Sequence, residues 1–213
     1  MGVYIVVIGD IIESKDLEPK ERKQTQIRLE EHFKQLNRQS GRGQLLSPYT
    51  ITLGDEFQAV YQSANRLFRD IWAIMAEIHP VRVRINISVG EITTEINREQ
   101  SIGMDGPAFH IARDRIEEMK EKDLLLTLST GNNQFDRLVN SSFQILSANL
   151  RGWNRNRLLI LRKRYEEIDV KQIADDLSLS EVAVYKNIRA GTLDAVQTLT
   201  GSISEMINEI VSP

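Results

Sequence analysis

Residues 3–10 read Val-Tyr-Ile-Val-Val-Ile-Gly-Asp, a run of β-favouring apolar residues that ends in a Gly-Asp turn pair. A continuous apolar run of this length is typical of a strand that is buried on both faces. We therefore expect residues 3–8 to form the central strand of a sheet. Asp10 would then stand where that strand ends.

Helices and strands alternate downstream of this strand. Apolar residues at helical spacing predict helices over about residues 19–38, 63–78, 106–122 and 134–150. Two short β-favouring runs around Gly54-Asp55-Glu56 predict a hairpin over 49–61. Residues 81–90 alternate strictly between apolar and polar, and residues 123–128 form one more short strand. The order β-α-β-β-α-β-α-β predicts an α+β fold of the ferredoxin-like type, with helices on one face of the sheet and one added strand.

The composition changes after residue 150. Residues 153–164 are basic and leucine-rich, and residues 170–189 contain two short helical patterns, followed by an apolar helix after Gly191. We therefore expect two domains, a mixed domain over 1–150 and a small all-α domain over 151–213.

The overall composition excludes several classes of site. The chain has 213 residues, a net charge of -3 and no cysteine, so disulfides, thiolate metal sites and cysteine nucleophiles are excluded. The three histidines are scattered, and any metal would need oxygen ligands. The longest apolar run is far below the ~20 residues of a membrane span, and no signal-peptide pattern is visible, which favours a cytoplasmic location without membrane contact.

Two aspartates each follow a β-favouring segment, and the predicted topology places these two segments side by side in the sheet. Asp10 ends the central strand and Asp55 stands at the hairpin tip, so both side chains are expected at one edge of the sheet. Two carboxylates there, with the backbone carbonyl of Ile11, would suit Mg²⁺ or Mn²⁺ with substrate phosphates as the remaining ligands. The alternative is that each aspartate simply caps its own turn.

Four segments carry a family resemblance. They resemble, in order, the landmark segments of class III nucleotidyl cyclases, and the hairpin is also similar to that of GGDEF-type diguanylate cyclases. The segments are residues 7–14, 52–61, 85–91 and 106–113. Together with its C-terminal part, the chain resembles the SatD family.

The cyclase resemblance implies a metal and a nucleotide. Asp10 and Asp55 match the metal-binding aspartates of that pattern, and Ile11 matches the backbone ligand between them. The ligand implied is a purine nucleotide with Mg²⁺ or Mn²⁺.

The same resemblance implies that little cyclisation remains. The Asn and Arg that stabilise the transition state in the family pattern are replaced by His110 and Asp114. Losing one such preorganised group typically costs ~10²- to 10³-fold in rate. We assign no catalytic residue and expect His110, Arg113 and Arg115 to bind the nucleotide. The alternatives are a packed or capping His110, and arginines that pair with acidic residues of their own helix.

The C-terminal part has helix-turn-helix spacing. Residues 170–189 have the order of such a motif: a first helix with a small residue, a short turn, and a second helix with two apolar packing positions. Ser178 stands in the turn where glycine is usual. Ser180 would cap the second helix. The exposed face of that helix would meet DNA through Glu181, Val182, Tyr185, Lys186 and Arg189.

The preceding basic segment would add phosphate contacts through Arg162, Lys163 and Arg164. Residues 151–213 nevertheless hold nine basic and nine acidic residues, so the module is neutral overall. Protein docking is therefore the alternative to DNA binding.

The last helix offers a dimer contact. Val196, Leu199, Ile203, Met206 and Ile210 are spaced as in the seam of a short coiled coil. The same stripe would also suit packing on its own domain.

These observations lead to one hypothesis with two alternatives. We expect a cytoplasmic regulator that joins a catalytically degenerate, cation- and nucleotide-binding domain to a DNA-binding helix-turn-helix, with a possible homodimer. The first alternative is an Mg²⁺-dependent nucleotidyl-transfer or nucleotide-hydrolysing enzyme that uses Asp10 and Asp55. The second is a protein-interaction scaffold.

Overall fold

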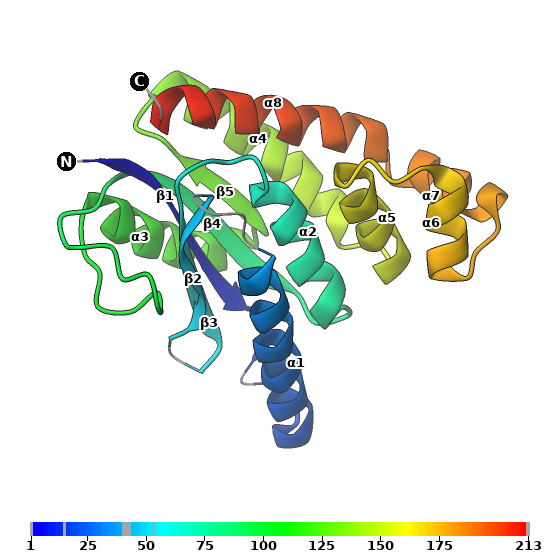
Figure 1. Cartoon of the computed structure of the whole chain (residues 1–213), viewed down its shortest axis with the longest axis horizontal. Helices are drawn as coiled ribbons and strands as arrows, with labels where there is room; N and C mark the ends of the chain where they lie inside the picture. The colour runs from blue at the N-terminus through cyan, green and yellow to red at the C-terminus, as the bar shows by residue number, and fades with distance from the viewer. Residues whose placement is uncertain (1, 15, 40–43, 53, 212–213) are drawn as a thin grey trace.

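The computed structural model describes residues 2–14, 16–39, 44–52 and 54–211. Within these residues the chain forms a five-stranded sheet and eight α-helices (Figure 1). The elements are β1 (Val3–Ile11), α1 (Pro19–Arg38), β2 (Leu45–Ile51), β3 (Glu56–Tyr61), α2 (Leu67–Ile78), β4 (Val83–Glu91), α3 (Pro107–Lys122), β5 (Leu126–Ser129), α4 (Asn133–Leu150), α5 (Arg155–Tyr165), α6 (Val170–Leu177), α7 (Glu181–Ala190) and α8 (Leu193–Val211). The predicted α+β class is confirmed.

The first strand occupies the centre of the sheet. The strand order is β2-β3-β1-β4-β5, in which β1 is antiparallel to both β3 and β4, and β5 is parallel to β4. Residues 5–8 of β1 are fully buried, as their apolar run predicts.

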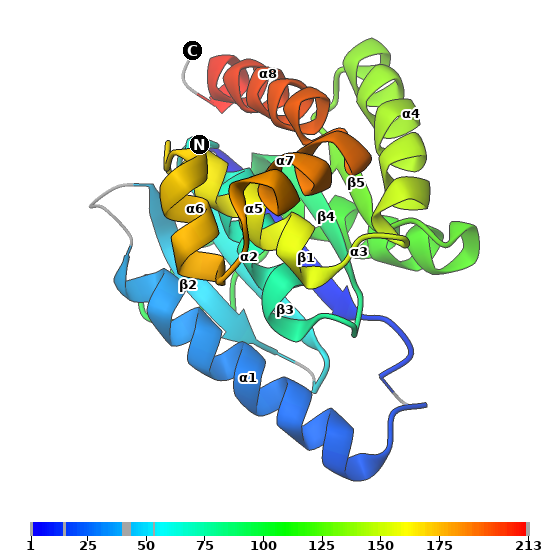
Figure 2. The same cartoon turned by 90° about the vertical axis from the view of Figure 1, so that its right-hand side faces the viewer.

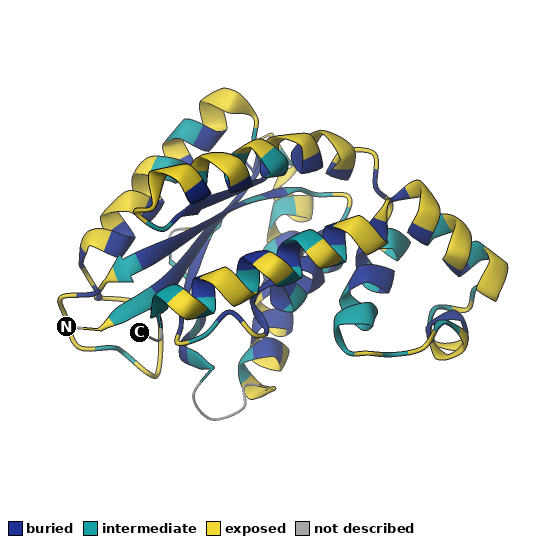
Figure 3. Cartoon of the chain, turned by 90° about the horizontal axis from the view of Figure 1, so that it is seen from above, coloured by how far each residue is buried: buried dark blue, intermediate teal, exposed yellow. Residues whose placement is uncertain are grey.

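Helices cover both faces of the sheet, unlike the one-faced arrangement that we expected. Ile5 and Val7 belong to a large core shared with α1, α2, α4 and α5, whereas Val6 and Ile8 pack with the apolar stripe of α3 on the other face. Figure 3 shows the buried strands between these outward-polar helices. Helix α3 packs closely on β4 at Gly90, where a Cβ would lie at an ordinary contact distance of 3.5 Å from Ala108.

The flanking helices fix the two edges of the sheet. Figure 2 shows α1 along the β2–β3 side and α4 along the β5 side, and both helices contact the neighbouring edge strand. No helix in the described part of the chain is long and apolar enough to cross a membrane.

The C-terminal helices share a core with the rest of the chain. Helix α5 packs on α2, with the rings of Trp72 and Trp153 6.4 Å apart, and α8 runs back to contact α2, β1 and β4. Figure 1 shows α6 and α7 at one end of the molecule. The Asn208 side chain accepts a hydrogen bond from the Ala64 N–H at 2.7 Å, which ties α8 to the turn before α2. The division at residue 150 stays a prediction, because one hydrophobic cluster includes residues from both sides of it.

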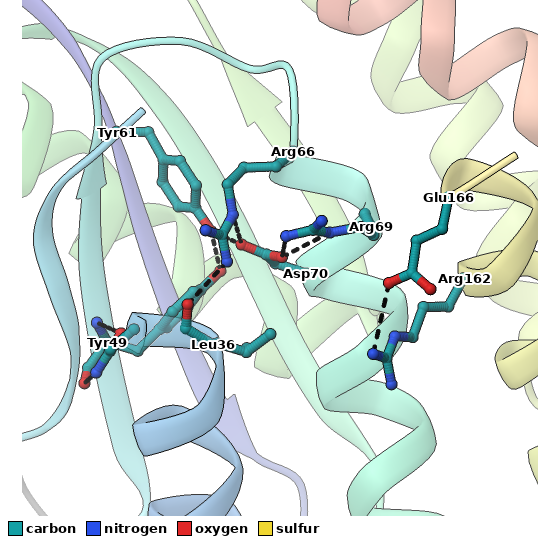
Figure 4. A network of polar contacts seen from close by, with 9 residues as sticks. Leu36, Tyr49, Tyr61, Arg66, Arg69, Asp70, Arg162 and Glu166 are labelled. Carbon is teal, nitrogen blue, oxygen red and sulfur yellow. Dashed lines mark hydrogen bonds and ion pairs between the residues drawn. The ribbon is translucent and has the colours of Figure 1, made fainter. Parts of the chain in front are cut away.

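A buried polar network joins β2, β3, α1 and α2. Figure 4 shows Asp70 accepting hydrogen bonds from the Tyr61 hydroxyl and the Arg66 Nε, both at 2.7 Å, and from Arg69. Arg66 also donates to the Leu36 carbonyl at 3.0 Å. Asp70 is fully buried, so its charge is tolerated only because these donors surround it.

Candidate functional site at the rim of β1 and β3

The pairing of β1 with β3 brings residues 10 and 55 to the same rim of the sheet. Asp10 lies opposite Glu56 in the register, and the Ile11 N–H donates to the Asp55 carbonyl at 3.1 Å. The N–H and C=O of one strand residue point toward the same neighbouring strand, so the Ile11 carbonyl also faces the β3 side. All three predicted metal ligands therefore lie at one place.

Asp10 is a mostly buried carboxylate with one direct counter-ion. Its Oδ2 accepts a hydrogen bond from Arg84 Nη1 at 2.9 Å, and only 11% of its side chain is exposed. Burial raises the pKa of Asp10 and nearby Asp55 raises it further, while Lys120 and Arg84 act in the opposite direction. On balance the pKa of Asp10 is raised, so the nearby positive charges do not fully offset the cost of burying the ionised carboxylate.

Asp55 is held in place by its surroundings. Its carboxylate accepts a hydrogen bond from the Ser14 hydroxyl, which belongs to the turn after β1. Gly54 supplies a positive φ of 67° at the hairpin tip, and its carbonyl accepts a hydrogen bond from Gln26 of α1. The tip is therefore fixed from two sides.

Glu56 adds a third carboxylate at the same rim. Burial raises its pKa, a hydrogen bond from Thr52 lowers it, and the charge of Asp10 raises it again. Glu13, which is also nearby in the sequence, is exposed and has a left-handed backbone with φ 55°. Glu13 therefore points to solvent from the turn.

The donor set suits a hard divalent cation that brings part of its own coordination shell. Asp10, Asp55 and the Ile11 carbonyl are oxygen donors of the kind that Mg²⁺ and Mn²⁺ prefer. Among the described residues, no three Asp, Glu, His or Cys side chains form a ready-made metal-binding group. A cation here would need oxygens from a ligand, as Mg²⁺ sites with phosphates do.

The predicted nucleotide-binding residues lie along α3. The helix begins beside Gly90, which pairs with Tyr4 at the far end of β1 from Asp10. His110 stands one turn into the helix, whereas Lys120 lies near Asp10, about 15 Å farther along the axis. His110 is thus distant from Asp10 and Asp55.

Each of these α3 residues has a local contact. His110 Nε2 lies 2.9 Å from Asp105 on an exposed surface. Arg115 pairs with Glu118 at 2.6 Å and donates to Ser129, so the expected pairing within the helix occurs for this arginine. Arg113 is exposed and its guanidinium carbon lies 5.8 Å from the centre of the Phe109 ring.

Two basic residues near Asp10, Arg84 and Lys120, were not predicted from the sequence to belong to the site. Arg84 was visible only as one polar residue of the alternating strand, and Lys120 as one charge of an amphipathic helix. Only the register of β4 against β1, and the placement of α3 on that face, show that both approach Asp10.

The sequence profile described as the SatD family matches residues 4–199. The chain belongs to the SatD family. A comparison with curated proteins found no significant match. Among solved structures, the chain is similar to one titled "Structure of a bacterial light-regulated adenylyl cyclase", with 17% identity and a TM-score of 0.45. That match covers 60% of the SatD-family chain and 42% of the other chain.

The C-terminal helices of this SatD-family chain form a tight helical pair. Helix α6 ends at Ser178, which adopts a left-handed conformation with φ 53° in place of the usual glycine. Ser180 caps α7, because its hydroxyl accepts a hydrogen bond from the Ala183 N–H at 3.1 Å. Val184 and Ile188 are buried, as the predicted packing of the second helix requires.

The outer face of α7 is open. Val182 is 77% exposed and Tyr185 is 49% exposed, and both line a shallow surface hollow with Lys186 and Arg189. Glu181 is also exposed, in the first turn of the helix. The predicted DNA-binding face is therefore accessible.

The three basic residues of α5 that were predicted to contact phosphates are engaged in ion pairs. Arg162 pairs with Glu166 of the following turn, Lys163 with Asp176 of α6, and Arg164 with Asp194 of α8. The last two contacts link α5 to α6 and α8. Phosphate groups would have to compete with carboxylates for these three side chains.

The apolar stripe of α8 mostly packs on its own chain. Val196 and Ile203 are buried, as are Leu193, Thr200 and Ile207. Met206 is 43% exposed and lines a surface hollow with Leu138 of α4. The predicted homodimer stays a prediction.

Proposed function

We propose that the rim of β1 and β3 binds a divalent cation, Mg²⁺ or Mn²⁺, together with the phosphates of a purine nucleotide. The observation that supports this proposal most directly is that Asp10 and Glu56, both with raised pKa values, lie beside Asp55 at one rim of the sheet. Burial is the main cause of both raised pKa values and a neighbouring carboxylate adds to each, and a cation relieves that cost. Asp10, Asp55 and the Ile11 carbonyl would hold the cation, which would neutralise phosphate charge.

We further propose that this ferredoxin-like, cyclase-type domain binds its nucleotide without cyclising it. The positions that supply transition-state groups in the class III cyclase pattern hold His110 and Asp114. Asp114 is exposed and negative, and would repel a triphosphate rather than stabilise it. Arg113 and Arg115 remain the α3 cations for phosphate contact, and we assign no catalytic residue.

Thermal unfolding with cation and nucleotide tests this proposal. A ligand that binds the folded state stabilises it by RT ln(1 + [L]/Kd), so Mn²⁺ with a purine nucleoside triphosphate should raise the Tm. The rise should be absent in Asp55→Asn and retained in Glu13→Gln, because Glu13 is an exposed carboxylate outside the rim.

The outcomes separate the proposed functions of this site. No shift with any cation and nucleotide would refute the binding proposal. Product formation that Asp10→Asn abolishes would instead favour the nucleotidyl-transfer or hydrolysis enzyme.

We also propose that the α6–α7 pair binds DNA, which would make the chain a regulator that couples nucleotide binding to transcription. The supporting observation is the capped α7 helix, with Tyr185, Lys186 and Arg189 accessible beside an exposed valine. A helix of this kind can enter the major groove while its cations contact phosphates.

Fluorescence anisotropy with a labelled duplex pool tests DNA binding. Affinity should fall with rising salt, and should be lost in a Lys186→Ala/Arg189→Ala double variant. Lys20→Ala/Lys23→Ala on α1 is the control with the same charge change away from this face. Absence of binding would favour a protein-interaction scaffold, and sedimentation equilibrium on the same sample would test the proposed homodimer.

A further inference from the structure

Arg84 forms an ion pair with Asp10, the carboxylate that the proposed cation would also bind. Its Nη1 lies 2.9 Å from Asp10 Oδ2, and the register of β4 against β1 places the two residues directly opposite each other. The side chains are 12% and 11% exposed, so the ion pair is largely shielded from water. This contact is the one direct ion pair of Asp10 within the described residues.

The guanidinium of Arg84 is incompletely satisfied in this position. Among the described residues, its buried Nε has no hydrogen-bond acceptor. A fixed structural arginine usually uses several of its five donors, often in a bidentate pair with a carboxylate. Arg84 instead makes a single contact with Asp10, and a contact of this kind is more readily exchanged.

A divalent cation and a guanidinium cannot share Asp10 without cost. Both are positive, and repulsion between charges is strong where water is partly excluded. The cation would therefore bind tightly only when Arg84 leaves Asp10, and Arg84 would pair with Asp10 whenever the cation is absent.

We propose that Arg84 is an internal counter-ion that competes with the divalent cation for Asp10 and thereby sets the affinity of the rim for metal. This proposal rests on the proposed cation site. Arg84 partly compensates the charge of Asp10 in the cation-free protein, and its displacement is the step that cation binding must drive. The contact is autoinhibitory toward metal binding.

Mn²⁺ alone is the probe, and its binding to the full chain is measured by electron paramagnetic resonance of the free ion. Arg84→Met removes the guanidinium and keeps a side chain of similar length. We expect it to bind Mn²⁺ about tenfold or more tightly than the wild type, since a charge-assisted hydrogen bond no longer has to be broken. Arg84→Lys keeps the charge and should bind with the wild-type affinity or between the two.

Lys120→Met is the matched control for a long-range charge effect. Lys120 also influences Asp10 electrostatically, but it is bonded to Glu117 and its side chain is 42% exposed. Its removal should also tighten Mn²⁺ binding at low salt. That gain should shrink in 0.5 M KCl, where the Debye length falls to roughly 4 Å, whereas the gain in Arg84→Met should persist.

The outcomes distinguish this inference from the proposed function. Absence of Mn²⁺ binding in the wild type and in both methionine variants would refute the proposed cation site itself. Binding that Asp10→Asn abolishes but Arg84→Met leaves unchanged or weakens would overturn the competition alone. An Arg84→Met gain that vanishes in high salt, as for Lys120→Met, would also overturn it. Thermal unfolding of each variant confirms that the chain is folded.

Discussion

Asp70→Asn tests whether the buried polar network holds the sheet edge to its helices. The substitution keeps the shape of the side chain but removes the carboxylate that Tyr61, Arg66 and Arg69 all contact. Arg66 has only 4% of its side chain exposed, so in Asp70→Asn its charge would lose the Asp70 carboxylate and could not readily gain water in exchange. Breaking a buried ion pair from one side costs about 3–5 kcal/mol.

That cost should be visible in a standard unfolding experiment. A chain of this size changes Tm by about 2–4 °C per kcal/mol, so Asp70→Asn should lower the Tm by roughly 10 °C. Urea unfolding followed by circular dichroism gives the free energy of unfolding directly. Arg69→Ala is the control, because Arg69 is 23% exposed and its removal leaves Asp70 paired with Arg66. We expect it to cost about 1 kcal/mol or less.

A double variant shows whether the broken Arg66–Asp70 ion pair causes the loss. Asp70→Asn/Arg66→Met removes both charges of the ion pair, and part of the lost stability should return, because the Arg66 charge no longer has to be buried without the Asp70 carboxylate. A loss below about 1 kcal/mol in Asp70→Asn, or a double variant less stable than the additive sum, would refute the reasoning.

Three further predictions concern the core and the rim. Gly9→Ala should cost about 1–3 kcal/mol, because its Cβ would lie 2.2 Å from the ring of buried Phe57; an unchanged urea midpoint would contradict this. His32 is buried, and burial lowers its pKa below the ordinary 6.5, so the unfolded chain takes up the proton first and stability falls as the pH drops from about 6.5. His32→Leu should flatten that part of the Tm–pH curve, and an unaltered slope would exclude His32 as its cause. Burial also raises the pKa of Glu56, so stability is lost as the pH rises through that pKa, and Glu56→Gln should raise the Tm of the cation-free protein at pH 7. This gain should disappear near pH 4, and a lower Tm at pH 7 would show that the ionised carboxylate is stabilising.

The sequence by itself determined the elements and the ends of several of them. The apolar run of residues 3–8 predicted a central strand, because only a strand covered on both faces can bury every side chain of such a run. The helix predicted over residues 106–122 begins at Pro107, and Ser180 predicted the cap of α7, because proline and capping signals act through neighbouring backbone groups. Local chemistry was enough in each case.

Only the tertiary structure decided which charges meet at the rim. Asp10 and Asp55 were expected to be neighbours from strand order, but Arg84 reaches Asp10 through a register that no local pattern specifies. The same holds for Lys163 and Arg164, whose partners lie on α6 and α8. A charged side chain looks alike in sequence whether it faces solvent or a carboxylate distant along the chain, because its pairing depends on strand register and helix packing.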